Sequence, residues 1–520
     1  MKRYLGPITC IFLGVWLVLM IGGRSRFFQD PGTFWHISVG NRIIDTGFFD
    51  TDPYTFTFAG KPWIPHQWLG ECTMAVLHRI DGFDRFDTLL LATCTLLAGV
   101  YAGLSVRLLR CGLHPSVVAV VIAFAVAASS GHFHVRPHLA TIVGMAVFMV
   151  YITDVENGRI SINRLLWLIP VTWLWANIHG GVLGGLATFA LAIAGWTANW
   201  LVGRDSPVTA RKDVGRLIVI WLGCVAVCFA NPYFYRLPYA WLEIYEMKSL
   251  PLIIKEHLLL DVTDWTGQSV IAFGVLYGLL LITIPVRQWR VGWLLPMIWF
   301  GLACMRVRHA PLFAVAGLVG IADLFPSTRI ATALLKRKSD LFTPGTIDDS
   351  ASIRESARPF ALPAGLIVLA LLLQAFGLML PLVGRGWAQL DPKIWPVELL
   401  PEIREHQNDR TNGTRIFCEY SYGGFLIYHA PGYRVFIDDR CELFGDDFLV
   451  KFEQAKAKLV LGIYASPAEP FAEWQAEYGS FDFALVETNK AFDEALSELP
   501  QAWEVVRQTD TATLYRKRVR

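Results

Sequence analysis

Long apolar runs separated by short polar connections fill most of the first 384 residues, and this alternation predicts a bundle of membrane-spanning helices. A nearly uncharged run of roughly 17 to 25 residues is long enough to cross a bilayer. About eleven such runs occur, at 7–23, 87–109, 115–130, 138–155, 165–178, 181–202, 216–231, 269–285, 291–305, 310–326 and 360–383. After residue 384, short alternating runs between turn residues predict a small α/β domain over 385–520.

The composition supports a membrane protein. Of the 520 residues, 54% are hydrophobic and 17% are charged, and the mean hydropathy is +0.42. This is more apolar surface than soluble cores of this size can bury. The net charge is only +2, and no basic patch with interleaved aromatic residues occurs, which excludes nucleic acid as a partner. We therefore expect the partners to include membrane lipids.

Basic residues gather in alternate connections between the predicted spans. Lys2 and Arg3 begin this series, and its further members are Arg107, Arg110, Arg159, Arg164, Arg204, Arg211, Lys212, Arg216, Arg287 and Arg290. By the positive-inside rule these connections are cytoplasmic, and so is the polar linker 327–358. The transmembrane domain then covers 1–384, with a cytoplasmic N-terminus and a long first outer loop at 25–86, and 385–520 is extracytoplasmic.

Histidines test this sidedness independently, because the orientation rests on Lys and Arg alone. Those at outer ends are His36, His66, His78, His132, His134, His138, His179, His257 and His309, whereas His114 falls inside. Polar groups in short loops beside the bilayer are costly and usually functional. The distribution predicts a polar cavity that opens on the outer side.

The first outer loop begins with an acid, and Gly32 to Thr46 then has the period of an amphipathic helix lying in the membrane interface. The side chains expected to face lipid are Phe34, Ile37 and Ile44, and Trp35 is expected at headgroup depth. An acid beside a helix N-terminus is favoured by the helix dipole. A capping Asp30 with an aromatic belt therefore explains this stretch without any chemistry, and that interpretation stays open.

Four strings of the first loop carry a family resemblance when taken in order: Asp30, "HISVGNRIIDTG", "TDPYTF" and "GKPWIPHQWL". They resemble the first outer loop of the GT-C glycosyltransferases, polytopic enzymes that use lipid-phosphate-linked sugars, and chiefly the bacterial aminoarabinose and mannosyltransferase-like branch. The later strings "VRPH", "WANIHGG", "NPY" and "RVFIDDRCELFG" are similar to a largely uncharacterised bacterial subgroup. Two departures stand out: Pro31 occupies the place of a second carboxylate, and "SGHFHVRPH" carries no acid.

The resemblance implies transfer of a sugar from a polyprenyl-phosphate-linked donor to an extracytoplasmic hydroxyl of a cell-envelope glycan, lipid or protein, in a bacterial inner membrane. Asp30 is then the general base, helped by His36 or His66. The candidates for the donor phosphate are Lys61, Arg136, Arg306, Arg308 and His309. Other polar groups expected in the pocket are Asp52, Glu71, His134, His138, Asn177, His179 and Glu256.

Several alternatives remain at this stage. Arg136 is also explained by snorkelling to lipid headgroups. The string "FIDDRCELFG" is explained either by a structural turn with ion pairs or by a role in acceptor recognition. No cofactor is implied with certainty; a divalent metal stays open, because the spacing of His132, His134 and His138 brings imidazoles within reach of one zinc ion. The competing functions are a transporter or flippase of a lipid-linked sugar and a non-catalytic envelope scaffold.

Overall fold

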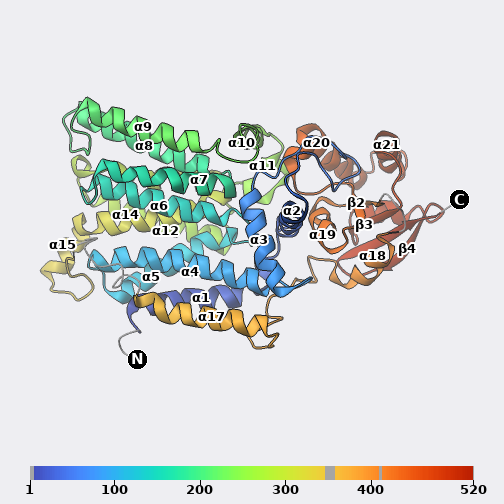
Figure 1. Ribbon diagram of the computed structural model, residues 1–520, viewed down its shortest axis with the longest axis horizontal. Helices are drawn as coiled ribbons and strands as arrows, with labels where there is room; N and C mark the ends of the chain where they lie inside the picture. Colours follow the sequence, from blue (N-terminus) through green and yellow to red (C-terminus); the bar gives the residue numbers. More distant parts are fainter. Residues whose placement is uncertain (1–4, 346–357, 409–412, 519–520) are drawn as a thin grey trace.

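The computed structural model describes residues 5–345, 358–408 and 413–518. Figure 1 shows long helices side by side in a bundle, with a smaller α/β unit at one end. Among the described residues, eight helical segments are long and apolar enough to cross a membrane: Pro7–Arg26 (α1), Asp87–Arg110 (α4), Pro115–His132 (α5 with η1), Leu139–Glu156 (α6), Val182–Leu201 (α8), Trp265–Ile282 (α12), Val307–Ser327 (α14 with η5 and η6) and Arg358–Ala375 (α17 with η7). The prediction of a multi-pass helical membrane protein is confirmed.

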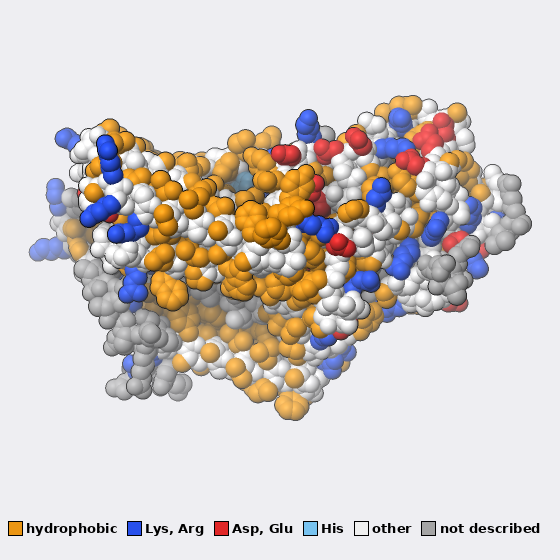
Figure 2. Space-filling model, turned by 45° about the horizontal axis from the view of Figure 1, so that its top comes forward, with side chains coloured by type: hydrophobic (Ala, Val, Ile, Leu, Met, Phe, Trp, Pro, Cys, Tyr) orange, Lys and Arg blue, Asp and Glu red, His pale blue; other side chains and the backbone are white. Residues whose placement is uncertain are grey.

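The three other predicted spans also fall on helices, but shorter ones. They are Leu168–Ile178 (α7), Arg211–Val227 (α9) and Val291–Met305 (α13). Figure 1 shows α7 and α9 running alongside α6 and α8 in the same bundle. Figure 2 shows hydrophobic side chains over much of the bundle, with Lys and Arg gathered at the end away from the sheet. We call these two ends the basic end and the domain end.

Helix α14 (Ala310–Leu324) is the centre of the bundle, because every one of its residues is buried. At its basic end Asp323 joins a buried network with Arg107, Asp154 and Arg159. The shortest N–O distances, 2.6 Å, are those from Arg107 to Asp154 and from Arg159 to Asp323. Two cations and two anions thus satisfy one another where α4, α6 and α14 meet. The predicted linker begins in this region with α15 (Arg329–Lys336), and its residues 346–357 lie outside the described chain.

The C-terminal part is the predicted small α/β domain. Its strands are β1 (Thr414–Cys418), β2 (Tyr433–Val435), β3 (Phe483–Glu487), β4 (Trp503–Gln508) and β5 (Ala512–Lys517), in the order β2-β1-β3-β5-β4. Its helices are α18 (Leu400–His406), α19 (Tyr420–His429), α20 (Cys441–Val460), α21 (Glu469–Tyr478) and α22 (Ala491–Ser497). Strands β1, β2 and β3 are parallel, so their carboxyl ends share one edge of the sheet. In α/β sheets this is the edge at which ligands bind.

The first loop forms two helices at the domain end, α2 (Gly32–Thr46) and α3 (Trp68–Asp81), and then joins the sheet. Phe56 N donates to Val435 O, and Val435 N donates to Tyr54 O, each at 3.1 Å. The loop therefore adds a short strand-like segment beside β2. Two further helices, α10 (Arg236–Glu246) and α11 (Leu250–Ile253), complete this end.

Helix α2 has the predicted bounds, but the prediction of a lipid-facing apolar side is wrong. Phe34 and Ile37 are 0% exposed and Trp35 is 3% exposed, whereas Ile44 is exposed. The Phe34 ring lies 4.9 Å from Trp395 and 5.6 Å from Phe425, between ring centroids. The C-terminal domain covers this face of α2, so its apolar side chains are buried in protein.

Candidate active site

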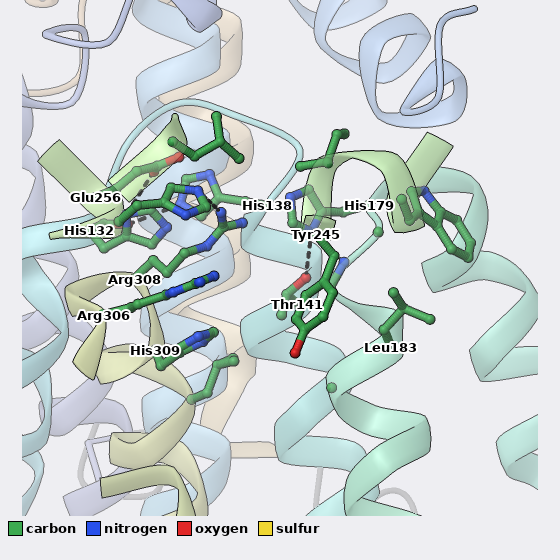
Figure 3. Close-up of a pocket in the computed structure, with 18 of the residues that line it drawn as sticks. His132, His138, Thr141, His179, Leu183, Tyr245, Glu256, Arg306, Arg308 and His309 are labelled. Carbon is green, nitrogen blue, oxygen red and sulfur yellow. Dashed lines mark hydrogen bonds and ion pairs between the residues drawn. The ribbon is translucent and has the colours of Figure 1, made fainter. Parts of the chain in front are cut away.

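A cavity of about 600 Å³ lies at the domain end of the bundle. Segments from the whole length of the chain line it: the first loop, the loops after α5, α7 and α13, helix α10, the turn at Glu256 and the tail segment that follows β2. Figure 3 shows Arg306, Arg308 and His309 on the same side as His132, His138 and Glu256, across from Leu183 and Tyr245. The predicted polar cavity is therefore present as one shared space.

One wall of the cavity is apolar and belongs to the transmembrane helices. Helix α8 supplies Leu183, Ala187 and Leu191, and α13 supplies Ile298 and Leu302. Leu191 is 45% exposed and Ile298 is 44% exposed. The wall therefore continues onto the outer surface of the bundle, where lipid chains would contact it.

Two arginines, with a histidine beside them, stand where this wall meets the domain end. Arg306, Arg308 and His309 come from the turn between α13 and α14, and the Arg308 guanidinium contacts the Nε2 of His257. Within the described residues, neither Arg306 nor Arg308 has a carboxylate oxygen within 4.0 Å. Unpaired guanidinium groups beside an apolar wall are costly, and an anionic ligand would offset that cost.

The histidines of the cavity are neutral hydrogen-bonding groups. His138 Nε2 donates to the backbone oxygen of His132 at 3.0 Å, and burial lowers the pKa of His138 to about 3. His179 Nδ1 accepts from Gly181 N at 2.9 Å. Burial lowers the pKa of His179, and the neighbouring His138 and the charge of Arg308 lower it further. His132 Nδ1 lies 3.4 Å from Glu256 Oε2. These imidazoles offer donors and acceptors beside the arginines without adding charge.

Arg136 connects the cavity to Asp30. Its Nη1 donates to Asp30 Oδ2 at 2.9 Å and lies 3.9 Å from Glu256 Oε1. The other Asp30 oxygen, Oδ1, accepts from Gly32 N at 2.8 Å. Asp30 therefore accepts a hydrogen bond from the first residue of α2, as expected of an acid beside a helix N-terminus, and it also pairs with the arginine of "VRPH".

Two buried polar pairs support the first loop behind the cavity. His36 Nδ1 and Glu71 Oε1 lie 3.0 Å apart; burial lowers the pKa of His36 and raises that of Glu71, because it disfavours the charged form of each. Arg440 Nη1 lies 2.8 Å from Asp52 Oδ1. Glu442, beside Arg440, accepts from Trp63 Nε1 at 2.8 Å.

The structure brings many of the predicted site residues together and leaves others apart. Those that line the cavity are His66, Arg136, His138, His179, Glu256, Arg306, Arg308 and His309. Asp30 and His134 lie next to them. Asp30 pairs with Arg136, and the charges of both residues affect the pKa of His134. The remaining predicted residues serve elsewhere: His36, Glu71 and Asp52 in the pairs above, Asn177 as acceptor from Trp68, and Lys61 on an exposed turn.

The main residues missed from sequence come from the tail. Asp439, Cys441 and Glu442 line the cavity, together with Trp241 of α10. The available signal was "FIDDRCELFG" directly after a strand, which we interpreted mainly as a structural turn. No pattern in the sequence shows that the carboxyl edge of β2 meets the domain end of the helical bundle.

The donor set does not fit a metal ion. His138 Nε2 is hydrogen-bonded to the backbone oxygen of His132 at 3.0 Å, so that nitrogen is not directed toward the other imidazoles. Within the described part of the chain, no three His, Cys, Asp or Glu side chains converge as metal ligands. We therefore derive no step through a bound metal.

No protein-family model and no curated protein matches the sequence. Solved structures do match. The oligosaccharyltransferase AglB from Archaeoglobus fulgidus, in complex with an inhibitory peptide and a dolichol-phosphate, has a TM-score of 0.54 at 11% identity over 92% of this chain and 69% of its own. The A. fulgidus oligosaccharyltransferase tethered to an acceptor peptide gives 0.53 at 12% identity over 98% and 74%.

A third structure, ArnT from Cupriavidus metallidurans bound to undecaprenyl phosphate, gives a TM-score of 0.48 at 14% identity over 97% of both chains. At these identities the oligosaccharyltransferase structures show the fold alone. The chain therefore has the GT-C membrane fold that the resemblance implied.

Proposed function

We propose that this protein is a membrane glycosyltransferase that transfers a sugar from a polyprenyl-phosphate-linked donor to an acceptor hydroxyl. One observation carries the proposal: a single cavity combines two guanidinium groups, which have no carboxylate within 4.0 Å among the described residues, with an apolar wall formed by transmembrane helices. A polyprenyl phosphate has the complementary chemistry, an anionic head on a long apolar chain. The dolichol-phosphate in the AglB structure is a lipid of the same class bound by a protein of the same fold.

In this proposal Arg306 and Arg308 bind the phosphate, and the prenyl chain lies along α8 and α13. The anomeric carbon of the sugar then faces Arg136 and the tail segment. Guanidinium donors stabilise the negative charge that develops on the phosphate oxygens as the glycosidic bond breaks. The neutral histidines nearby can hydrogen-bond sugar hydroxyls without competing for the phosphate.

The proton of the acceptor hydroxyl requires a base, and the sequence analysis assigns this role to Asp30. Both Asp30 oxygens accept hydrogen bonds, from Gly32 N and from Arg136. The assignment therefore requires the Asp30–Arg136 pair to open when substrate binds.

We place the cavity on the extracytoplasmic face of a bacterial inner membrane. The support is the accumulation of Lys and Arg at the basic end, which the positive-inside rule assigns to the cytoplasm. An acceptor in the cell envelope, whether glycan, lipid or protein, would then reach the cavity from the side of the C-terminal domain.

A binding experiment tests the proposal before any sugar is known. The full chain in lipid nanodiscs is titrated with undecaprenyl phosphate, and with undecaprenol as the control that lacks phosphate. We expect tight binding of the phosphate only, weakened roughly 10- to 100-fold by Arg306→Ala or Arg308→Ala, because a charge-assisted hydrogen bond is worth about 1.5–3 kcal/mol. Arg287→Ala, an exposed arginine at the basic end, is the matched control. Equal binding of undecaprenol would overturn the proposal.

A second experiment separates the enzyme from the competing functions. Labelled polyprenyl-phosphate hexoses and pentoses are supplied to the reconstituted protein, and released polyprenyl phosphate is measured. A glycosyltransferase cleaves the bond between sugar and phosphate, whereas a flippase moves the intact donor between leaflets. Tight binding with neither cleavage nor movement would favour the scaffold.

A further inference from the structure

The C-terminal domain places one carboxylate in the cavity whose bonding is incomplete. Asp439 follows β2 and lines the cavity, and its Oδ1 is buried without a hydrogen-bond partner. The two other acids that line the cavity are engaged. Glu256 lies 3.4 Å from His132 and 3.9 Å from Arg136, and Glu442 accepts from Trp63. Asp439 is therefore the cavity acid with an oxygen available for a substrate group.

The residues on either side of Asp439 are locked in place. Asp438 Oδ1 accepts from Arg440 N and Nε, each at 2.9 Å, and its Oδ2 accepts from Arg440 Nη2 at 2.6 Å. Arg440 Nη1 reaches Asp52 of the first loop at 2.8 Å, and the side chains of all three are 0% exposed. Asp438, Arg440 and Asp52 thus form a buried ion triad. Because the triad fixes the residues on both sides of Asp439, it holds the Asp439 side chain in one position.

Helix α19 sets where Asp439 lies relative to Asp30, through two adjacent glycines. A Cβ on Gly423 would lie 2.1 Å from Ile437 O and 2.6 Å from the Cα of Asp438, and a Cβ on Gly424 would lie 2.4 Å from Pro31 O. Only glycine permits such close backbone contact. The helix is thus wedged between the residue that precedes Asp439 and the residue that follows Asp30.

The electrostatic surroundings suit proton transfer. Burial, and then the negative charge of Asp30, raise the pKa of Asp439 well above its usual range, against the opposing charge of Arg136. A carboxylate is a more effective general base when its pKa lies nearer the working pH. Asp438 adds to this rise and a hydrogen bond from Trp35 opposes it. Both oxygens of Asp30 accept hydrogen bonds, from Gly32 N and from Arg136, whereas Asp439 Oδ1 has no hydrogen-bond partner among the described residues.

We propose that Asp439, supplied by the C-terminal domain, is the general base of the transfer and that Asp30 is a positioning residue that holds Arg136. This inference rests on the proposed glycosyltransferase function. The acceptor oxygen forms a bond to the anomeric carbon while the bond from that carbon to the phosphate oxygen breaks. The hydroxyl proton passes to Asp439, and the polyprenyl phosphate departs with the bonding electron pair toward Arg306 and Arg308.

The test compares four variants of the full chain in nanodiscs: Asp439→Asn, Asp439→Glu, Asp30→Asn and Asp447→Asn. Asp447 lies exposed on α20 and serves as the matched control. Two quantities are measured for each, namely the rate of polyprenyl phosphate release from the labelled donors, with water or envelope extract as acceptor, and the Kd of undecaprenyl phosphate. Melting temperatures identify any variant that has lost its fold.

We expect Asp439→Asn to lower kcat roughly 10²- to 10⁴-fold, the usual contribution of a general base, with the Kd of undecaprenyl phosphate within about threefold of wild type. In the wild type kcat should fall at acidic pH, and Asp439→Glu should keep part of the activity with this limb displaced. We expect Asp30→Asn to lower kcat less than Asp439→Asn does, because the amide oxygen of asparagine can still accept from Arg136, and Asp447→Asn to change neither quantity.

Two results overturn the inference, and they are distinguishable. If the wild type releases polyprenyl phosphate and a folded Asp439→Asn variant keeps kcat within about threefold, Asp439 is not the base and the proposed function stands. If the wild type neither binds undecaprenyl phosphate nor cleaves any donor, the proposed function fails and this inference fails with it. Should Asp439→Asn not fold, Asp439→Glu decides, because an unaltered pH profile would contradict the role.

Discussion

Replacing Arg440 with Met should release the first loop from the C-terminal domain. Arg440 is 1% exposed and forms ion pairs with Asp52 at 2.8 Å and Asp438 at 2.6 Å. Removing one member of a buried ion network leaves its partners charged and unpaired, which costs about 3–5 kcal/mol. A cost of this size exceeds a third of the stability of many domains.

Two amides report this loss directly. Phe56 N and Val435 N form the hydrogen bonds that join the loop to β2. If the free energy of local opening falls by 3–5 kcal/mol, hydrogen exchange at these amides should become faster by between roughly 10²-fold and several thousandfold. This follows because about 1.4 kcal/mol corresponds to a factor of ten in an equilibrium constant. Exchange is measured by mass spectrometry on the full chain in nanodiscs, with peptides covering 52–57 and 433–440.

Two comparison variants make this prediction refutable. The triple variant Asp52→Asn, Asp438→Asn, Arg440→Met removes the whole network and should recover most of the protection, because no buried charge is left unpaired. Arg404→Met also breaks an ion pair between the loop and the domain, with Asp84 at 2.7 Å, but both side chains are about one third exposed, so we expect at most about 1 kcal/mol. Unchanged exchange in Arg440→Met, or equal losses in the single and triple variants, would refute the reasoning.

Three further predictions use melting temperatures of the full chain. Gly424→Ala should destabilise the protein by about 1–3 kcal/mol, because the added methyl would meet Pro31 O at 2.4 Å, whereas Gly278→Ala, with nothing within 4 Å, should not. Burial lowers the pKa of His78 to about 4, so the unfolded chain binds more protons than the folded one between about pH 6.5 and 4. The free energy of unfolding should therefore decrease by up to about 3 kcal/mol as the pH falls through this window, and His78→Asn should remove this dependence. Asp323→Asn should cost about 3–5 kcal/mol, because it leaves buried arginine charge at the basic end uncompensated. Effects below about 0.5 kcal/mol in Gly424→Ala or Asp323→Asn, or an unchanged pH profile in His78→Asn, would contradict the respective argument.

The membrane part of the fold could be predicted from sequence. Each transmembrane helix forms its backbone hydrogen bonds internally, and its long apolar run is recognisable without knowledge of the rest of the fold. The short spans were harder to judge by the same rule. Helix α7 has 11 residues in α-helical form and is preceded by a 3-10 segment, Ile162–Trp167, so its apolar run does not correspond to one regular helix. The bounds of α2 were also correct, since its period is local.

The partner of each face could not be predicted. An amphipathic period shows that Phe34 and Ile37 require an apolar neighbour, but it does not distinguish lipid from protein. The neighbours turned out to be Trp395 and Phe425, far along the chain. The same limit explains Asp52, which was expected in the pocket but pairs with Arg440.

Sidedness gave a better guide to the candidate site than motif position did. Lys61 was chosen because it stands in a family string, and it lies exposed on a turn, whereas Arg306 and His309 were chosen because polar groups at the end of a span are costly, and both line the cavity. The free-energy cost of moving a polar side chain out of water depends only on that side chain and on its position in a span. It can therefore be inferred from sequence. Asp439 carries no such mark, because it enters the cavity from a soluble domain whose carboxylates are ordinarily hydrated. A residue whose role depends on two surfaces meeting can be recognised only once their contact is known, and here that contact is made by Gly423, Gly424 and the buried Arg440.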